Sequence, residues 1–390
     1  MSYCRHDTIA GLMSLCADHA QNARVFFSHD AGSDWVIDDD RLIHRQTQFF
    51  SIAGYAAPDG RHVLLLEQPE TALVMLLLTR DPDGTRSFVL ITRNEPGLIG
   101  GTNLSTTIQS TPANYQQRHG GGATPFIDLA LAPTDGCHVL YDALQPDWGE
   151  FYRGKTKRFM IVETDAPLAL PDGLISVPVS LSPQILMQDH LGTNDLRSAL
   201  VLLHSLKPGE PVITDIAPPP APDLGKRIPL GSFAERAARD GRGLAFLDER
   251  GVGVRHFETT SPSREVHRWQ QPLLCPGTET HISLVMRMRG GTPEYAIRQM
   301  AQTGTGGIRH WHPAAPLSPP ANIQAQVRTS SEGGRFWQHQ ITLTLAMSDG
   351  ASLPEDVTWV SQDALKTYIR TPNATSVDLR MVASLALTHE

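Results

Sequence analysis

The chain has 390 residues, long enough for two or three domains that each bury a hydrophobic core. Its 33 lysines and arginines against 41 aspartates and glutamates give a net charge of −8, which excludes the basic footprint of a nucleic-acid-binding protein. Four widely spaced cysteines without a C-x-x-C pair give no sign of a zinc or redox site, and no apolar run could cross a bilayer. We expect a cytoplasmic protein with no nucleic-acid or membrane partner.

Two strand-like runs, residues 72–78 and 87–92, flank the turn sequence DPDG at 81–84. Apolar runs on either side of such a turn are typical of a β-hairpin. Two helices are predicted further on, one beginning with a cap at Ser182 and one covering 195–206, where leucines recur at helical spacing. The first half therefore combines a sheet with packed helices.

Between the hairpin and these helices lies a polar segment at 95–119, EPGLIGGTNLSTTIQSTPANYQQRH. Its β-branched residues predict an extended stretch from 104 to 110. Alternation would place a row of neutral hydrogen-bonding groups on one face, which suits sugar hydroxyls, although a polar sheet edge would look the same. That row consists of Ser105, Thr107, Gln109 and Thr111.

Thr111 precedes a proline, which predicts a cap and the first turn of a short helix. The helix would carry Asn114, Tyr115 and Arg118 and end at His119. A capped surface helix without a ligand is the alternative. The pattern alone leaves both interpretations open.

The second half of the chain repeats the order of these elements. The proline-rich segment APPPAP at 217–222 predicts a stiff linker. Beyond it, residues 282–288 and 294–300 flank GGTP at 290–293 and predict another hairpin. Two more helices follow, one capped by Ser361 and one covering 377–387.

Short similar stretches show the repetition directly. GEFY at 149–152 returns as GRFW at 334–337, an offset of 185 residues, and DLR at 195–197 returns at 378–380. Upstream, the Gln-Pro pair at 68–69 aligns with 271–272, an offset of 203 residues. The second copy has therefore lost 18 residues between these anchors, and the loss falls in the polar segment.

We predict an α+β fold of two tandem mixed-sheet units related by internal duplication. Residues 1–207 form the first unit, with an N-terminal extension and the candidate site. Residues 208–227 form the linker, and residues 228–390 form a second, degenerate unit.

The sequence TTIQSTPANYQQRHGG at 106–121 resembles the T-V-Q-A-T-x-x-N-Y-x-x-x-H segment of the nucleotide-diphosphate-hexose 2,3-dehydratases. The resemblance extends over most of the chain. Further stretches that resemble the family, in the expected order, lie at 35–55, 68–69, 95–97, 144–163, 195–197, 264–266, 269 and 271–274.

This resemblance implies two Nudix-like halves in one subunit, a homodimer, and a carbon–oxygen lyase in deoxysugar and natural-product biosynthesis. The substrate would be a nucleotide-diphosphate sugar, a dTDP-linked 4-keto-6-deoxyhexose, which loses its C2 hydroxyl without a metal or a redox cofactor. It also points to a downstream 3-ketoreductase as a partner.

Such an elimination requires a base for the C3 proton, an acid for the leaving hydroxyl and donors for the enolate. Within the polar segment we expect Glu95 or His119 as the base, Tyr115 as the acid, and Gln109 or Asn114 as donors. Each also has a structural interpretation, because a glutamate can stabilise a turn, a histidine can cap a helix and a tyrosine can pack in a core.

Substrate contacts are expected in the same segment and in the basic run GKTKR at 154–158, since guanidinium and ammonium groups complement phosphate oxygens. A solvated charged surface is the alternative. Nearby aromatic rings could stack the nucleotide base. The expected substrate-binding residues are Thr107, Thr111, Asn114, Arg118, Trp148, Tyr152, Lys155 and Arg158, with Trp269 and Gln271 from the second copy.

The chain departs from the family pattern in both copies. The family's A-K-x-E-P-G-N motif reads ITRNEPGL at 91–98, and Pro112 and Ala113 replace polar residues of the N-Y motif, which points to a changed substrate. The second copy carries TGTGG at 303–307 and HWHP at 310–313 instead. We expect these two histidines to be surface residues and not metal ligands, because no carboxylate or cysteine lies near them in the sequence.

Other functions remain as alternatives. A Nudix pyrophosphatase would need the G-x5-E-x7-R-E-x-x-E-E helix, which the sequence lacks, and a built-in nicotinamide site would need a G-x-G-x-x-G turn. A dehydratase-like enzyme acting on a different activated keto substrate would keep the chemistry. The eroded second copy also fits a non-catalytic nucleotide-sugar-binding or scaffold protein.

Overall fold

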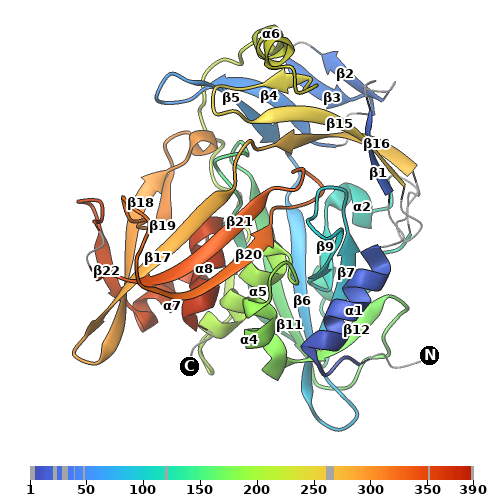
Figure 1. Cartoon of the computed structure of the whole chain (residues 1–390). Helices are drawn as coiled ribbons and strands as arrows, with labels where there is room; N and C mark the ends of the chain where they lie inside the picture. Colours follow the sequence, from blue (N-terminus) through green and yellow to red (C-terminus); the bar gives the residue numbers. More distant parts are fainter. Residues whose placement is uncertain are drawn as a thin grey trace.

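The computed structural model describes residues 5–20, 24–28, 34–38, 40–46, 49–118, 122–260, 268–349 and 352–387. This part of the chain forms a mixed α/β fold with two large mixed sheets and two smaller antiparallel sheets (Figure 1). None of the helices in these ranges is long and apolar enough to span a membrane.

The first large sheet has the strand order β12-β7-β6-β11-β10-β13, with β8 paired to β7 and β9 paired to β6. The hairpin predicted near the start of the chain is confirmed, because Leu77 of β6 pairs with Val89 of β7. The strands are β6 (Ala72–Arg80), β7 (Arg86–Asn94), β8 (Thr102–Ser105), β9 (Ile108–Ser110), β10 (Cys137–Pro146), β11 (Thr156–Thr164), β12 (Leu174–Pro178) and β13 (Ile213–Asp215).

The second large sheet has the order β19-β18-β17-β21-β20, with β22 paired to β18. The second predicted hairpin is also confirmed, because Met286 of β17 pairs with Tyr295 of β18. The strands are β17 (Thr280–Arg289), β18 (Thr292–Ala301), β19 (Arg309–Pro313), β20 (Ile323–Ser330), β21 (Gln340–Met347) and β22 (Thr358–Ser361).

The four predicted helices are confirmed, and α5 and α8 pack together between the two large sheets (Figure 1). The Arg197 side chain of α5 donates to Ser384 Oγ of α8 at 2.8 Å. Ser361 caps α7, but the cap expected at Ser182 is wrong, because its hydroxyl donates to the Val179 carbonyl. The helices are α1 (Ile9–Ala20), α2 (Pro112–Tyr115), α3 (Ile127–Leu131), α4 (Ser182–Met187), α5 (Asn194–Ser205), α6 (Leu230–Asp240), α7 (Gln362–Arg370) and α8 (Val377–Leu387), with 3-10 turns η1 (Val179–Leu181) and η2 (Thr303–Thr305).

The two smaller sheets lie together at the top of Figure 1, next to α6. One has the order β2-β3-β4-β5, and the other has the order β1-β15-β14, with β16 paired to β15. Because β1 pairs with β15, residues near the N-terminus share a sheet with the second half. The strands are β1 (Arg24–Ser28), β2 (Trp35–Asp38), β3 (Arg41–His44), β4 (Ser51–Ala56), β5 (His62–Glu67), β14 (Phe246–Leu247), β15 (Gly253–Thr260) and β16 (Arg268–Cys275).

The two large sheets share one topology. In both, a central parallel pair, β6 with β11 or β17 with β21, is flanked by antiparallel neighbours, and an edge strand, β12 or β22, leads into two helices. In the described residues of the second half, nothing corresponds to β9, α2 and α3, because the chain runs from β19 to β20 without another strand or helix. This difference coincides with the polar segment.

The strand pairing changes one anchor of the sequence alignment. Gln68 follows the end of β5, whereas Gln271 lies inside β16, opposite Phe257. Leu66 and Leu274 occupy matching places instead, since each forms an isolated parallel bridge with the turn after β10 or β20. The alignment of the two Gln-Pro pairs is therefore wrong.

Candidate functional site

The polar segment does not form the single extended face that its alternation predicts. A turn at residues 106 and 107 separates β8 from β9, and the two strands join different neighbours. The Thr107 side chain is 4% exposed, and its hydroxyl accepts from Leu77 N at 2.9 Å and donates to the Val89 carbonyl at 2.5 Å. Thr107 therefore links β6 to β7 and does not face the site.

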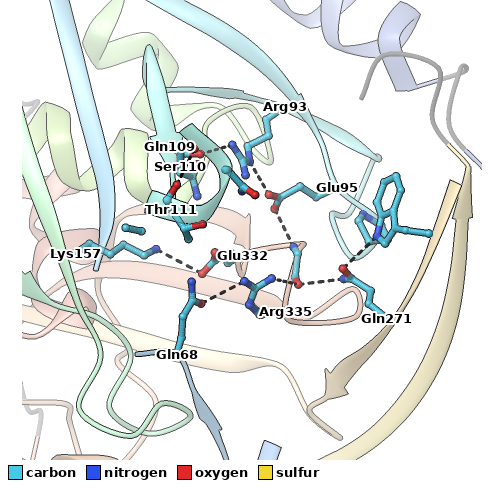
Figure 2. Close-up of a pocket in the computed structure, with 15 residues that line it drawn as sticks. Gln68, Arg93, Glu95, Gln109, Ser110, Thr111, Lys157, Gln271, Glu332 and Arg335 are labelled. Atoms are coloured by element: carbon cyan, nitrogen blue, oxygen red, sulfur yellow. Dashed lines mark hydrogen bonds and ion pairs between the residues drawn. The ribbon is translucent and has the colours of Figure 1, made fainter. Parts of the chain in front are cut away.

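The rest of the segment borders a cavity of about 110 Å³ between the two halves, which we call the central cavity (Figure 2). Its lining is mostly polar, and six of the residues predicted from the sequence are part of it: Glu95, Gln109, Thr111, Asn114, Trp269 and Gln271. The other lining residues are Gln68, Ala72, Arg93, Pro96, Ser110, Lys157, Glu332, Gly334 and Arg335.

Glu95 lies at the junction of the halves, 6% exposed. One carboxylate oxygen accepts from Arg93 Nε at 2.5 Å, and the other accepts from the backbone N–H of Gly334 at 2.9 Å. Gly97 follows and donates to the Gly333 carbonyl at 2.9 Å. A Cβ atom on Gly97 would lie 1.6 Å from the Phe336 carbonyl oxygen, so this close approach requires glycine.

The amide of Gln109 borders the same space from β9. Its Oε1 accepts from Ser105 Oγ at 2.8 Å, an arrangement that orients the amide nitrogen as a donor, and its carbonyl accepts from Arg93 Nη1 at 2.8 Å. Thr111 is the N-cap residue of α2, as predicted, but its side chain makes no cap hydrogen bond. Asn114 lies on the next turn and is exposed.

A cluster of buried charges closes the cavity opposite Glu95 (Figure 2). The Lys157 ammonium lies 2.8 Å from Asp195, 3.2 Å from Asp147 and 3.5 Å from Glu332. Lys155 bridges the last two carboxylates at 2.9 and 3.3 Å. Since isolated charges are costly to bury, this mutual pairing is what allows them to lie here.

The pairing also sets the charges at neutral pH. Burial alone would lower the pKa of Lys157, but Asp147, Asp195 and Glu332 outweigh it and hold this pKa well above its ordinary value. Burial would raise the pKa of Glu332, but Lys155 and Lys157 hold it well below the ordinary value. Burial raises the pKa of Asp195. The site thus presents a fixed ammonium beside an ionised carboxylate.

The second half completes the wall. Arg335 Nη2 donates to Gln68 Oε1 at 3.2 Å, and Gln271 Nε2 donates to the Gly334 carbonyl at 3.1 Å. Trp269 Nε1 donates to Gln271 Oε1 at 3.1 Å. The site expected within the first copy is therefore built from both halves.

Several predicted residues do not reach the central cavity. Trp148 and Tyr152 are 5% and 1% exposed and line a smaller adjoining cavity, so neither offers a free ring face for a base. Lys155 is buried among carboxylates, and Arg158 is paired with Asp142 through two hydrogen bonds of 2.6 and 2.7 Å. Both cations are therefore already paired with carboxylates, and of the basic run only Lys157 lines the central cavity.

The remaining predicted residues lie on or beside α2. Tyr115 packs against a core cluster that includes Met75 and Val162, and burial raises its pKa. Arg118 is 49% exposed on its side chain and lies 3.5 Å from Glu70. His119 lies outside the described residues.

Sequence reasoning missed five polar lining residues: Gln68, Arg93, Ser110, Glu332 and Arg335. Arg335 and Gln68 lie in stretches that the repeat search had found, so a signal existed, but it was interpreted only as duplication. Arg93 is two residues before Glu95 on β7 and belongs to the motif that departs from the family pattern. Glu332 carries no local signal, because it reaches the site from the other half.

The two histidines of the second half are not surface residues, so that prediction is wrong. His310 and His312 lie on β19, 9% and 3% exposed, and His312 Nδ1 is 3.6 Å from Asp378 Oδ2. No group of three histidine, cysteine or carboxylate side chains within the described ranges is arranged to hold a metal ion.

Paired carboxylates, a buried ammonium and amide donors around one polar cavity are the groups of an acid–base enzyme. Residues 16–203 match the family model described as NDP-hexose 2,3-dehydratase. Together with the relatives described next, this match supports the NDP-hexose 2,3-dehydratases, which are hydro-lyases, as the family that the chain resembles, as its sequence predicts.

Similar curated proteins share this description over most of their length. The chain is 27% identical to the dTDP-4-dehydro-6-deoxy-alpha-D-glucopyranose 2,3-dehydratase of Streptomyces violaceoruber, with 88% of each chain covered. Enzymes of the same name from Saccharopolyspora spinosa and Amycolatopsis orientalis are 23% and 24% identical, over 91% and 87% of this chain and 86% and 80% of theirs. A solved Nudix hydrolase from M. smegmatis, RenU, is 16% identical and matches 33% of this chain and 81% of its own with a TM-score of 0.20.

Proposed function

We propose that the chain removes water across C2 and C3 of a dTDP-linked 4-keto-6-deoxyhexose, as the names of its relatives describe for them. One observation carries the proposal: the Glu95 carboxylate and the Lys157 ammonium lie on opposite sides of one cavity, with the Gln109 amide on its wall (Figure 2). A sugar ring between them would meet a base and a fixed positive charge.

The chemistry begins at C3, whose proton is acidified by the neighbouring 4-keto group. Glu95 takes this proton, and the electron pair of the C3–H bond moves to the keto oxygen to form an enolate. The Lys157 ammonium and the Gln109 amide stabilise the negative oxygen, because both are donors held in place by neighbouring side chains. The pKa of Lys157, well above its ordinary value, keeps this group charged throughout.

The enolate then expels the C2 hydroxyl. Glu95, now protonated, returns its proton to the leaving oxygen, so one carboxyl group serves both steps and no charge accumulates. The product tautomerises to a 2-deoxy-3,4-diketo sugar, which a downstream 3-ketoreductase would consume. Arg93 and the Gly334 N–H hold the Glu95 carboxylate in place for both transfers. In this scheme Tyr115 and His119 have no direct role.

Mass spectrometry of the reaction tests the proposal. The purified chain is incubated with dTDP-4-keto-6-deoxyglucose, and the expected result is a product lighter by one water, with exchange of the C3 proton for solvent deuterium in the unreacted substrate. A Glu95→Gln variant should show neither change. If the wild-type chain causes no loss of water and no exchange at C3, the dehydratase proposal is wrong; release of phosphate instead would support a pyrophosphatase.

We also propose that the halves 1–207 and 228–390 are Nudix-like units that arose by duplication, joined by residues 208–227. The shared topology of the two large sheets supports this. The homodimer implied by the family resemblance remains a proposal. Light scattering should give twice the 42.7 kDa chain mass, and a monomeric mass would contradict it.

A further inference from the structure

We propose that Arg380 of α8 is a positioning residue for the reaction, because it fixes the end of β10 and, through that strand end, the Lys157 ammonium. This role rests on the proposed function, in which the ammonium faces the sugar. The steps of that function do not use Arg380, although the DLR stretch that contains it occurs in both halves, at 195–197 and 378–380.

The Arg380 side chain joins the second half to one strand end of the first. It is 1% exposed, and its Nη2 donates to the Pro146 carbonyl at 2.5 Å. Its Nη1 donates to Gln145 Oε1 at 3.3 Å and to the Thr375 carbonyl of its own half at 2.6 Å. One side chain of the second half thus holds two consecutive residues at the end of β10.

These two residues are neighbours of the charged groups of the site. Gln145 lies directly opposite Lys157 in the pairing of β10 with β11. Pro146 precedes Asp147 in the chain. The Asp147 carboxylate lies 3.2 Å from the Lys157 ammonium and 2.9 Å from the Lys155 ammonium. A displacement of this strand end would therefore move both the backbone opposite Lys157 and a carboxylate that holds its ammonium.

The charge of Arg380 acts on the same carboxylate. Each hydrogen bond that Arg380 donates to the described residues ends on a neutral carbonyl, amide or hydroxyl oxygen. Burial lowers the pKa of Arg380 to about 10, and Asp147 is the strongest of the groups that oppose this shift. The guanidinium therefore stays charged at neutral pH and attracts the carboxylate that faces Lys157.

Arg197, the matching residue of the first half, is equally buried but has different partners. It is 2% exposed, and burial lowers its pKa to about 10 as well. Its Nη1 donates to the Leu186 carbonyl at 2.7 Å and to Ser384 Oγ at 2.8 Å, and neither acceptor belongs to β10 or to the central cavity. The site thus uses the aspartate of one DLR stretch, Asp195, and the arginine of the other, Arg380.

Steady-state turnover of the 4-keto sugar by the full chain tests the assignment. Arg380→Met keeps an apolar stem and removes the contacts with β10. Its kcat should fall about 10- to 100-fold, since small displacements of reacting groups have effects of this size. Its KM should change less than about threefold, because Arg380 touches no substrate.

Arg197→Met is the matched control, because it removes an arginine of the same burial from the other DLR stretch. It should lower Tm about as much as Arg380→Met does, since both variants leave buried acceptors unpaired, but it should keep the wild-type kcat. Wild-type kcat in Arg380→Met, or equal losses of kcat in the two variants, would overturn the assignment.

A conservative variant separates positioning from simple loss of structure. Arg380→Lys keeps the charge but lacks the guanidinium fork that spans the Pro146 and Thr375 carbonyls. It should recover part of the kcat that the methionine variant loses. If Arg380→Met does not fold, the lysine variant decides, because full wild-type kcat in Arg380→Lys would overturn the assignment.

Crystal structures of the two methionine variants distinguish this role from the proposed function. The Lys157–Asp147 separation, 3.2 Å in the wild type, should lengthen by about 1 Å or more in Arg380→Met and stay unchanged in Arg197→Met. An unchanged separation in Arg380→Met overturns the assignment even where water is still eliminated. If the separation lengthens only in Arg380→Met but the wild-type chain eliminates no water, the positioning stands and only the proposed function fails.

Discussion

The two halves present matching loops to each other but fill them with different side chains. Glu95 stands two residues before Gly97, whose N–H bonds to the second half at 2.9 Å. Gln302 stands two residues before Gly304, whose N–H bonds to the first half at 2.6 Å. The backbone arrangement is thus repeated, while the carboxylate of one half is an amide in the other.

The charges next to these loops differ in the same way. In the first half Asp195, at the start of α5, binds the Lys157 ammonium. In the second half Asp378, at the start of α8, accepts from Gln302 Nε2 at 3.0 Å, and the strand position 185 residues after Lys157 is Thr342. The repeated backbone arrangement therefore carries the Glu95 carboxylate and the Lys157 ammonium in one half only. The second half contributes its loop, with Glu332 and Arg335, to the first site.

The largest effect is expected when Glu95 is replaced by glutamine, the residue type that the second half has at the matching position, Gln302. Glu95→Gln keeps an acceptor for the Gly334 N–H but removes the base, and kcat should fall about 10³-fold. Steady-state turnover of the 4-keto sugar measures the effect. Glu163→Gln, which breaks an ion pair with Arg86 on the same sheet, is the control and should keep full activity. A kcat within about tenfold of wild type would show that the carboxylate is not the base.

The second test asks whether the second half acts in the first site. Glu332 accepts from the Tyr152 hydroxyl at 2.9 Å and lies 3.5 Å from the Lys157 ammonium. Glu332→Gln should lower kcat about 10- to 100-fold, because it loosens the ammonium that faces the enolate. Glu294→Gln is the control, because Glu294 also lies in the second half and its side chain is 18% exposed, against 19% for Glu332. Equal kcat in both variants would confine the chemistry to the first half.

The two halves should also differ in how the unfolding free energy depends on pH below neutrality. Burial lowers the pKa of His310 on β19 to about 4, from an ordinary value of 6.5, with help from His312 and Arg380. Below about pH 6.5 the His310 ring of the unfolded chain gains a proton, whereas the ring of the folded chain does not. The contribution of the neutral ring to the unfolding free energy is therefore complete above that pH and is lost as pH falls towards 4. The corresponding strand β8, TNLS, has no titratable side chain.

Between pH 6.5 and about pH 5 the unfolding free energy of the His310→Gln variant should therefore fall by about 2 kcal/mol less than that of the wild type. Denaturant unfolding at several pH values measures it. His138→Gln, at an exposed position, should leave the wild-type slope unchanged. An unchanged slope in the His310 variant would mean that this ring titrates normally in the folded chain.

The sequence predicted the elements well where the pattern is local. Both hairpins and four helices follow from turn sequences and apolar spacing, which depend on near neighbours. Gln109, Thr111 and Asn114 reach the central cavity because β9 and α2 form where the β-branched run and the Thr-Pro cap predict. Family resemblance added Trp269 and Gln271 from the second half.

What the sequence could not predict depends on contacts between distant segments. Glu332 reaches Lys157 across 175 positions in the chain, and no local pattern announces that pairing. Thr107 fits the alternation, but the turn at 106 and 107 redirects its hydroxyl into the sheet. Trp148 and Tyr152 look like accessible aromatic residues, and only the packing of the second half against them shows their burial.

The smallest expected effect concerns Arg118, for which the sequence predicted a phosphate contact. Its side chain is half exposed beside Glu70 at 3.5 Å, and surface pairs of this kind contribute about 0–1 kcal/mol. Arg118→Ala should therefore change KM less than about threefold, whereas Arg335→Ala, on the wall of the central cavity, should raise KM about tenfold. A tenfold rise in KM for Arg118→Ala would instead place the diphosphate along α2, so that the first half alone would hold the whole substrate.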